Sequence, residues 1–125
     1  MTREELSTIT KRVIGSAIKV HKALGPGFVE RIYEQALGYE MKRQHIAFVG
    51  QKPIQVRYEG VELGTQRVDL MVEDAVMVEL KSVSAINEIH EAQMLSYLKA
   101  ADKRVGLILN FAKTRLDIKR MVNRF

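Results

Sequence analysis

The spacing of the apolar residues changes at residue 48, and this change does most to limit how the chain can fold. Before it, apolar side chains recur every three or four residues, as on one face of a helix. After it they recur every second residue, as in a strand. Helices followed by strands, with a further helix and strand after them, are typical of an α/β domain. At 125 residues the chain has the length of one domain, which we expect to cover residues 1–125.

Two helices are predicted before residue 48. Thr2 and Glu5 have the spacing of a capping box, which marks the start of the first helix. The stretch "GPG" at 25–27 ends this helix, because Gly caps a helix end and Pro cannot continue the turn. A second helix is predicted over residues 29–44 from the same periodicity.

A hairpin and two short strands are predicted in the middle of the chain. Alternating apolar residues run up to Tyr58, where the pair Glu59-Gly60 predicts a hairpin turn. Two further strands are predicted over 68–72 and 75–81, separated by a tight turn.

The last third of the chain combines a helix with a buried strand. Residues 87–101 have helical composition, and Asn87 is a suitable N-cap. The run "RVGLILNF" at 104–111 is almost entirely apolar, as in a strand that is covered on both faces and reached by a helical crossover. The tail "LDIKRMVNRF" fits either a strand or a short helix. The predicted order is therefore α-α-β-β-β-α-β, an α/β fold with a mixed central sheet flanked by helices.

Charged side chains interrupt the two most strand-like segments, "VDLMV" and "VMVELK". By alternation, Val68 and Leu70 are expected on one face of a strand and Asp69 on the other. If the two strands are neighbours, Asp69, Glu79 and Lys81 converge. Two close carboxylates repel each other unless a cation lies between them, and a hard ion such as Mg²⁺ prefers oxygen ligands. The alternative is a solvated face on which Glu79 and Lys81 form an ordinary ion pair.

Several spaced motifs then resemble one enzyme superfamily. Asp69 followed by "VELK" on the next strand, then a helix and a buried strand, resembles the PD-(D/E)XK nuclease superfamily. Residues 27–33 match the GxxExxY signature of one branch of it, and Gln93 with Tyr97 match the QxxxY motif of RecB-like nucleases. The resemblance begins at about residue 13, covers nearly all of the remaining chain, and implies a restriction-endonuclease-like fold.

The resemblance implies a metal centre with an adjacent lysine. Asp69 and Glu79 would hold Mg²⁺ or Mn²⁺, with the backbone carbonyl of Val78 or Leu80 as a further ligand. Glu30 would add an acidic group at the metal, either directly or through water. Lys81 would lie beside the attacking water and stabilise developing negative charge.

Further side chains are implied to lie near the substrate. Gln93 and Tyr97 would border the active site, although they also fit the polar rim of a helix. His90, one turn earlier, could hydrogen-bond a phosphate or have a structural role. Tyr33 either packs in the core or orients Glu30.

The net charge of +5 is distributed unevenly along the chain. Residues 51–98 hold four basic and eight acidic side chains, whereas residues 99–125 hold eight basic and two acidic ones. A basic region next to an acidic one suits a polyanion that meets a metal centre, although basic surfaces also aid solubility. Lys119 and Arg120 are candidates for sequence-independent phosphate contacts.

These features predict a metal-dependent nuclease that hydrolyses phosphodiester bonds of nucleic acid, with DNA favoured over RNA. The main alternative is a non-catalytic module of the same fold that binds nucleic acid or a protein partner. The chain is small, so gripping a duplex would call for such a partner or a homodimer. A small-molecule hydrolase with the same metal is a third reading, and it lacks a recognisable pocket motif.

Composition also bears on where the protein works. The chain has no cysteine, which fits a reducing cytosol. No apolar run approaches the roughly twenty residues needed to cross a bilayer, and the polar start is unlike a signal peptide. We therefore expect a cytoplasmic protein that does not bind membranes.

Overall fold

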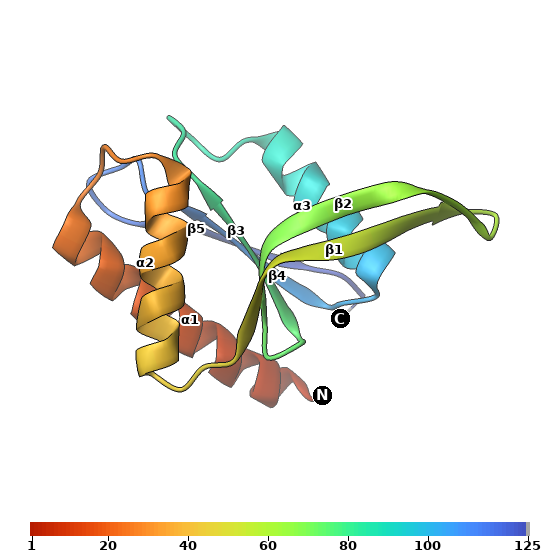
Figure 1. Ribbon diagram of the computed structural model, residues 1–125, viewed down its shortest axis with the longest axis horizontal. Helices are drawn as coiled ribbons and strands as arrows, with labels where there is room; N and C mark the ends of the chain where they lie inside the picture. The colour runs from red at the N-terminus through yellow and green to blue at the C-terminus, as the bar shows by residue number, and fades with distance from the viewer. Residues whose placement is uncertain (125) are drawn as a thin grey trace.

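A computed structural model describes residues 1–124, which form three helices and five strands (Figure 1). The helices are α1 (Arg3–Leu24), α2 (Glu30–Arg43) and α3 (Glu88–Ala101). The strands are β1 (Phe48–Tyr58), β2 (Val61–Val72), β3 (Val76–Lys81), β4 (Val105–Asn110) and β5 (Asp117–Val122). The predicted order is confirmed, and the tail, for which a strand and a helix were both open, forms β5. Its last residue, Phe125, lies outside the described residues.

The five strands make one mixed sheet in the order β1-β2-β3-β4-β5. β3 and β4 run parallel, and the connection between them contains α3, as the apolar run over 104–111 predicted. The other neighbours are antiparallel. The α/β fold with a mixed sheet flanked by helices is therefore confirmed.

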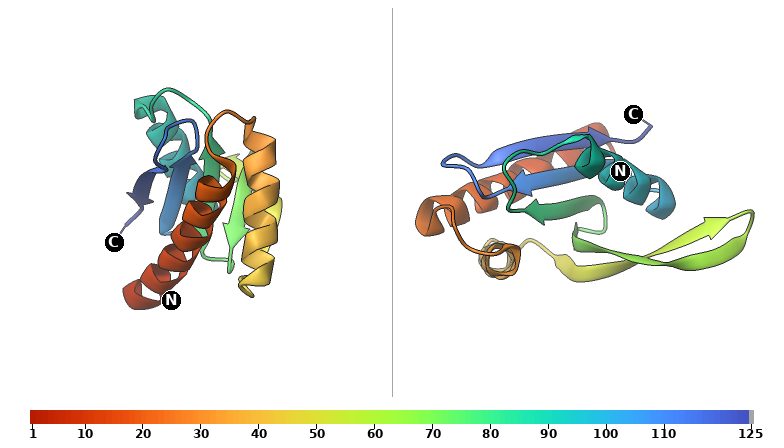
Figure 2. Two further views of the ribbon diagram at one scale, coloured as in Figure 1. Left: turned by 90° about the vertical axis from the view of Figure 1, so that its left-hand side faces the viewer. Right: turned by 90° about the horizontal axis from the view of Figure 1, so that it is seen from above.

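The helices cover opposite faces of the sheet (Figure 2). α1 and α2 pack on one face, where Val13 and Leu37 belong to the larger core cluster. α3 packs on the other face, where Met94 and Leu98 belong to a second cluster. β4 lies between the two layers and is buried along its whole length, which explains its apolar sequence.

The helix boundaries follow from local capping. Thr2 accepts a hydrogen bond from the backbone of Glu5 at 3.0 Å, and the Glu5 carboxylate accepts one from the Thr2 backbone at 2.9 Å, which completes the predicted capping box. Gly25, with φ of 70°, ends α1. At α3 the Asn87 side chain accepts from the backbone of Ile89 at 3.0 Å.

β1 and β2 form a hairpin that extends well beyond the other strands (Figure 1). Its turn lies at Glu59 and Gly60, as predicted, and both residues have positive φ. β2 begins at Val61, earlier than the predicted strand over 68–72. The prediction missed residues 61–67 because they are exposed on both faces. A strand without a buried face lacks the apolar alternation from which strands are predicted.

The hairpin strands reverse their faces near Asp69, and the expectation that Val68 and Leu70 share a face is wrong. Leu70 packs in the cluster beneath α1 and α2, whereas Val68 packs in the cluster beneath α3. On β1, Phe48 and Ile54 divide between the two clusters in the same way. Residues separated by an even number share a face of a regular strand. Each strand must therefore contain an irregular residue between these positions.

Candidate functional site

Asp69 and Glu79 meet where β2 and β3 separate. The last backbone pair of the two strands is Leu70 with Val78. Beyond it, the Asp69 backbone N–H donates to Glu79 Oε1 at 3.0 Å, and the Leu80 backbone N–H donates to Asp69 Oδ2 at 2.9 Å. Side-chain carboxylates thus take the place of the next rung of the sheet, and the predicted convergence of the two acids is present in the structure.

The buried position of Glu79 leaves its negative charge poorly compensated. The residue is 7% exposed. Burial, and then the charge of Asp69, raise the pKa of Glu79 to about 8, although the nearby Lys81 acts in the opposite direction. A carboxylate in this setting holds a proton unless a cation replaces it, so the pair fits a hard divalent ion. Within residues 1–124, no three His, Cys, Asp or Glu side chains are grouped as a metal site, so other oxygen donors would complete the shell.

The backbone of Leu80 is placed to supply one such donor. The carbonyl of Lys81 accepts from the Phe111 backbone at 2.9 Å, so the backbone groups of Lys81 point toward β4. Those of Leu80 point the opposite way, and its N–H is the one donated to Asp69. The Leu80 carbonyl therefore points to the β2 side of β3, where pairing with β2 has ended.

α2 connects to this pair through Glu34 and Gln51. Glu30 is exposed at the first residue of the helix. Glu34, one turn later, is half-buried and accepts hydrogen bonds from Gln51 Nε2, which also donates to Asp69 Oδ1 at 3.3 Å. Burial raises the pKa of Glu34, and the charges of Asp69 and Glu30 raise it further. Glu34 and Gln51 were missed in the sequence. The available signal was the four-residue spacing from Glu30, which places Glu34 on the same helix face.

Lys81 lies at the end of β3 beside Glu79, on which its charge acts. The segment that follows it is fixed by Asn110, which is fully buried. The Asn110 side chain accepts from the Val83 backbone N–H at 3.1 Å and donates to the Val83 carbonyl at 2.9 Å. The chain after Lys81 is thereby held against the end of β4. This contact fixes the backbone position from which the Lys81 side chain extends.

On α3, Tyr97 and Gln93 border the carboxylate pair. Burial raises the pKa of Tyr97, and the charges of Glu79 and Asp69 raise it further, whereas a hydrogen bond with Gln93 lowers it. The Tyr97 hydroxyl also donates to Gln66 Oε1 on β2 at 3.1 Å. Tyr97 is therefore close enough to be affected by the charges of both acids, and Gln93 contacts Tyr97.

His90 and Tyr33 serve the protein's own backbone. His90 Nδ1 accepts from the Asn87 N–H at 3.1 Å and completes the cap of α3. Tyr33 is fully buried and stacks on Phe111 with ring centroids 4.5 Å apart. Its hydroxyl donates to the Gly25 carbonyl at 2.5 Å. Of its two predicted roles, Tyr33 has the first, packing in the core, and its hydroxyl also holds the loop before α2. The position expected beside the substrate is therefore corrected to a buried one.

Lys119 and Arg120 lie on opposite faces of β5. Lys119 is paired across the sheet with Ile108 of the α3-side cluster, and its ammonium lies 3.8 Å from a Glu91 carboxylate oxygen. Arg120 is paired with Leu107, which belongs to the cluster on the α1 and α2 side. Because neighbouring residues of a strand point to opposite faces, the two cations do not form one patch.

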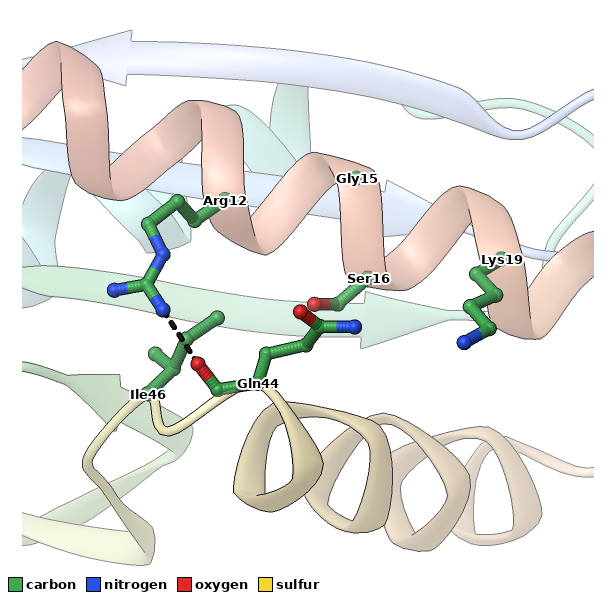
Figure 3. Close-up of a pocket in the computed structure, with 6 residues that line it drawn as sticks. All are labelled: Arg12, Gly15, Ser16, Lys19, Gln44 and Ile46. Atoms are coloured by element: carbon green, nitrogen blue, oxygen red, sulfur yellow. Dashed lines mark hydrogen bonds between the residues drawn. The ribbon is translucent and has the colours of Figure 1, made fainter.

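A separate pocket of about 240 Å³ lies between α1 and the end of α2, and neither Asp69 nor Glu79 lines it (Figure 3). It is lined by Arg12, Gly15, Ser16, Lys19, Gln44 and Ile46. The Arg12 guanidinium donates to the Gln44 carbonyl at 2.5 Å, and Lys19 lies 3.3 Å from Glu40 Oε2. Arg12 and Lys19, the basic residues of this pocket, are thus paired with groups of the protein itself.

Comparisons with known proteins agree with this fold. A model of the PD-(D/E)XK nuclease superfamily matches residues 7–121. The crystal structure of SSO0001 is similar, with a TM-score of 0.58 and 14% sequence identity, over 76% of this chain and 50% of that one. This chain thus spans about half the length of SSO0001, and at such an identity the likeness concerns the fold alone. Curated proteins gave no significant match. None of the helices within residues 1–124 is long and apolar enough to cross a membrane.

Proposed function

This chain belongs to the PD-(D/E)XK nuclease superfamily, and we propose that its Asp69–Glu79 site hydrolyses phosphodiester bonds of nucleic acid with the help of a divalent metal ion. The observation that carries the proposal is the pair of carboxylates between β2 and β3, where burial, and then the charge of Asp69, raise the pKa of Glu79 to about 8. Members of this superfamily generally use divalent ions, and the site has the charge and the oxygen donors that such an ion needs.

Each residue of the site has a distinct task in this proposal. Asp69, Glu79 and the Leu80 carbonyl hold Mg²⁺ or Mn²⁺. The ion supplies the positive charge that polarises the phosphate and activates water. The Lys81 ammonium, next to Glu79, stabilises negative charge that develops on the phosphate and the nucleophile. Stabilisation of this charge and positioning of the nucleophile are the tasks we assign to Lys81.

The side chains of α3 line the substrate side of the site in this proposal. Gln93 and Tyr97 lie next to the acids and offer neutral hydrogen-bonding groups to the strand being cut. His90 keeps its second ring nitrogen, Nε2, for a phosphate, since Nδ1 is used in the helix cap. Lys119, on the same face of the sheet as α3, adds a phosphate contact at a greater distance.

We propose DNA as the preferred substrate and the GxxExxY branch as the chain's place in the superfamily, on the match at residues 27–33.

The second candidate function is a nuclease-fold module that binds without cutting. It is favoured by the absence of a three-carboxylate metal cluster within the described part of the chain. Against it stands the presence of Asp69, Glu79 and Lys81 together at one site.

A cleavage panel tests the two candidates. The purified chain is incubated with labelled single- and double-stranded DNA and RNA, with Mg²⁺, with Mn²⁺ and with EDTA. We expect metal-dependent cleavage that Asp69→Asn abolishes. Binding without cleavage on every substrate and with every metal would favour the non-catalytic module.

A further inference from the structure

Gln51 connects α2 to the carboxylate pair through one amide group. Its Nε2 lies 3.0 and 3.2 Å from the two carboxylate oxygens of Glu34, and 3.3 Å from Asp69 Oδ1. Since both partners are carboxylates and accept hydrogen bonds, the NH₂ end of the amide must face them. Glu34 comes from a helix and Asp69 from the second strand, so Gln51 of β1 joins two elements that the chain does not join directly.

The backbone of Gln51 is unusual for a residue in a strand. Its φ is 50°, in the left-handed region that residues with a side chain rarely adopt. It lies opposite Asp69, between the cross-strand pairs Gly50 with Leu70 and Lys52 with Val68. These are the positions between which both hairpin strands reverse their faces. Gln51 therefore sits at the irregularity of the hairpin, directly across from Asp69.

The conformation is held in place by a neighbour. The Arg67 guanidinium donates to the Gln51 carbonyl at 2.9 Å, across the hairpin. Gln51, although exposed, is thus hydrogen-bonded both through its backbone carbonyl and through its side-chain amide. An unfavourable backbone conformation that persists because its surroundings hold it is a frequent feature of functional sites.

We propose that Gln51 is a positioning residue of the metal site, which orients Asp69 and holds the negative charge of Glu34 beside it. The inference rests on the proposed function, because it assumes a divalent ion at Asp69 and Glu79. A neutral amide suits the task. It donates to two carboxylates without cancelling their charge, whereas Lys or Arg at this position would supply the positive charge that the metal ion has to bring.

A shortened side chain separates the amide bridge from the backbone conformation. Asn accepts positive φ more readily than Gln does, so Gln51→Asn keeps or improves the backbone and withdraws the amide by one methylene group. The matched control is Gln55→Asn on the same strand, where the side chain contacts Thr65 and none of the carboxylates. The readouts are Mn²⁺ affinity by calorimetry and the thermal unfolding midpoint in EDTA.

We expect Gln51→Asn to weaken Mn²⁺ binding by about ten- to a hundredfold, the usual effect of losing a group that orients a metal ligand. Its unfolding midpoint in EDTA should equal or exceed that of the parent, and Gln55→Asn should match the parent in Mn²⁺ affinity. In a Glu34→Gln background the same Gln51→Asn change should have a smaller effect, because the charge that the amide holds is already gone.

Two results would overturn the inference and leave the proposed function intact. One is an Mn²⁺ affinity of Gln51→Asn equal to that of the parent. The other is a loss of affinity accompanied by a lower unfolding midpoint in EDTA, which would assign Gln51 to the fold. A parent protein that binds no Mn²⁺ at all would contradict the proposed function itself, and the inference with it.

Discussion

Two buried glutamates, Glu40 and Glu79, show how differently this protein treats similar groups. Glu40 is 5% exposed and Glu79 is 7% exposed. A hydrogen bond from Gln44, together with Lys19 and Arg43, lowers the pKa of Glu40. Burial and the charge of Asp69 raise the pKa of Glu79 to about 8. The exposed fractions are nearly equal, yet burial is the largest cause of the raised pKa of Glu79, whereas the hydrogen bond from Gln44 outweighs burial at Glu40.

The two groups also differ in how their charge is compensated. Around Glu40, between α1 and α2, the protein supplies two cations and an amide of its own. Around Glu79 it supplies a second carboxylate and, at the end of the strand, Lys81. The charges around Glu40 compensate one another within the fold, whereas the pair at Glu79 would be stabilised by a cation bound from solution. An uncompensated buried charge therefore marks the candidate site.

The largest effect is expected from removing one of the uncompensated acids. Glu79→Gln should weaken Mn²⁺ binding by more than about a hundredfold, because losing a ligand costs more than losing a group behind it. The fold should survive, since Gln can still accept the hydrogen bond from the Asp69 backbone. Calorimetry with Mn²⁺ measures the change.

The control is the compensated acid. Glu40→Gln should leave Mn²⁺ affinity unchanged and lower the thermal unfolding midpoint, because Lys19 and Arg43 lose their carboxylate partner. If Glu79→Gln and Asp69→Asn both bind Mn²⁺ like the parent, the acids are a solvated strand face and the contrast with Glu40 has no functional meaning.

Lys81→Ala should separate metal binding from catalysis. Metal ligation needs oxygen donors, so Mn²⁺ affinity should stay the same or rise when a nearby positive charge is removed. Turnover should fall by about a hundredfold or more, as for other preorganised groups that stabilise developing charge. Lys81→Arg should rescue turnover poorly, because the guanidinium is larger and differs in shape.

Lys113→Ala is the matched control for Lys81, since Lys113 pairs with Asp117 on the surface. This variant should cut at the parental rate on the substrate found in the cleavage panel. Parental turnover by Lys81→Ala, with metal bound, would rule out the role given to this lysine.

The stability of the metal-free protein should depend on pH through Glu79. The folded protein keeps the Glu79 proton up to a pKa of about 8, whereas the unfolded chain releases it near 4.5. The folded state therefore binds more protons between these values, and the free energy of unfolding should fall as pH rises through them and level off above. Each pKa unit corresponds to about 1.4 kcal/mol, so the total is on the order of a few kcal/mol.

Urea unfolding at a series of pH values in EDTA measures this slope. Glu79→Gln should flatten it, and saturating Mg²⁺ should restore stability on the alkaline side. Glu40→Gln should leave this part of the profile unchanged. A slope that persists in Glu79→Gln would assign the pH dependence to other groups.

The smallest effect is expected at β5. Lys119 shares a face with α3 and the site, whereas Arg120 points to the opposite face. Lys119→Ala should reduce the slope of log affinity against log salt for duplex DNA by roughly one unit, the value for one phosphate contact. Arg120→Ala should leave this slope unchanged. Equal effects of the two variants would place nucleic acid across the edge of the sheet.

The sequence predicted those parts of the fold that depend on local patterns. The cap at Thr2, the break at Gly25 and the turn at Glu59 and Gly60 are each specified by a few adjacent residues, and all are found in the structure. The convergence of Asp69 and Glu79 followed from the alternation of two short strands.

Nonlocal geometry accounts for what the sequence did not predict. Alternation assigned Val68 to the wrong face, because it did not predict the irregular strand residue that reverses the faces next to Asp69. Glu34 was missed because only the packing of α2 against the hairpin brings it to Gln51. Lys119 and Arg120 were treated together because the tail had no assigned strand whose alternation would separate them.

The most direct test of the central claim is a carboxyl ¹³C NMR titration of Glu79, assigned with the Glu79→Gln variant, in EDTA and in Mg²⁺. We expect an apparent pKa of about 8 without metal, and a markedly lower value with Mg²⁺, which competes with the proton for the carboxylate. The Glu40 resonance should titrate below 4.5 in both conditions. A Glu79 pKa near 4.5 that Mg²⁺ does not change would contradict the account.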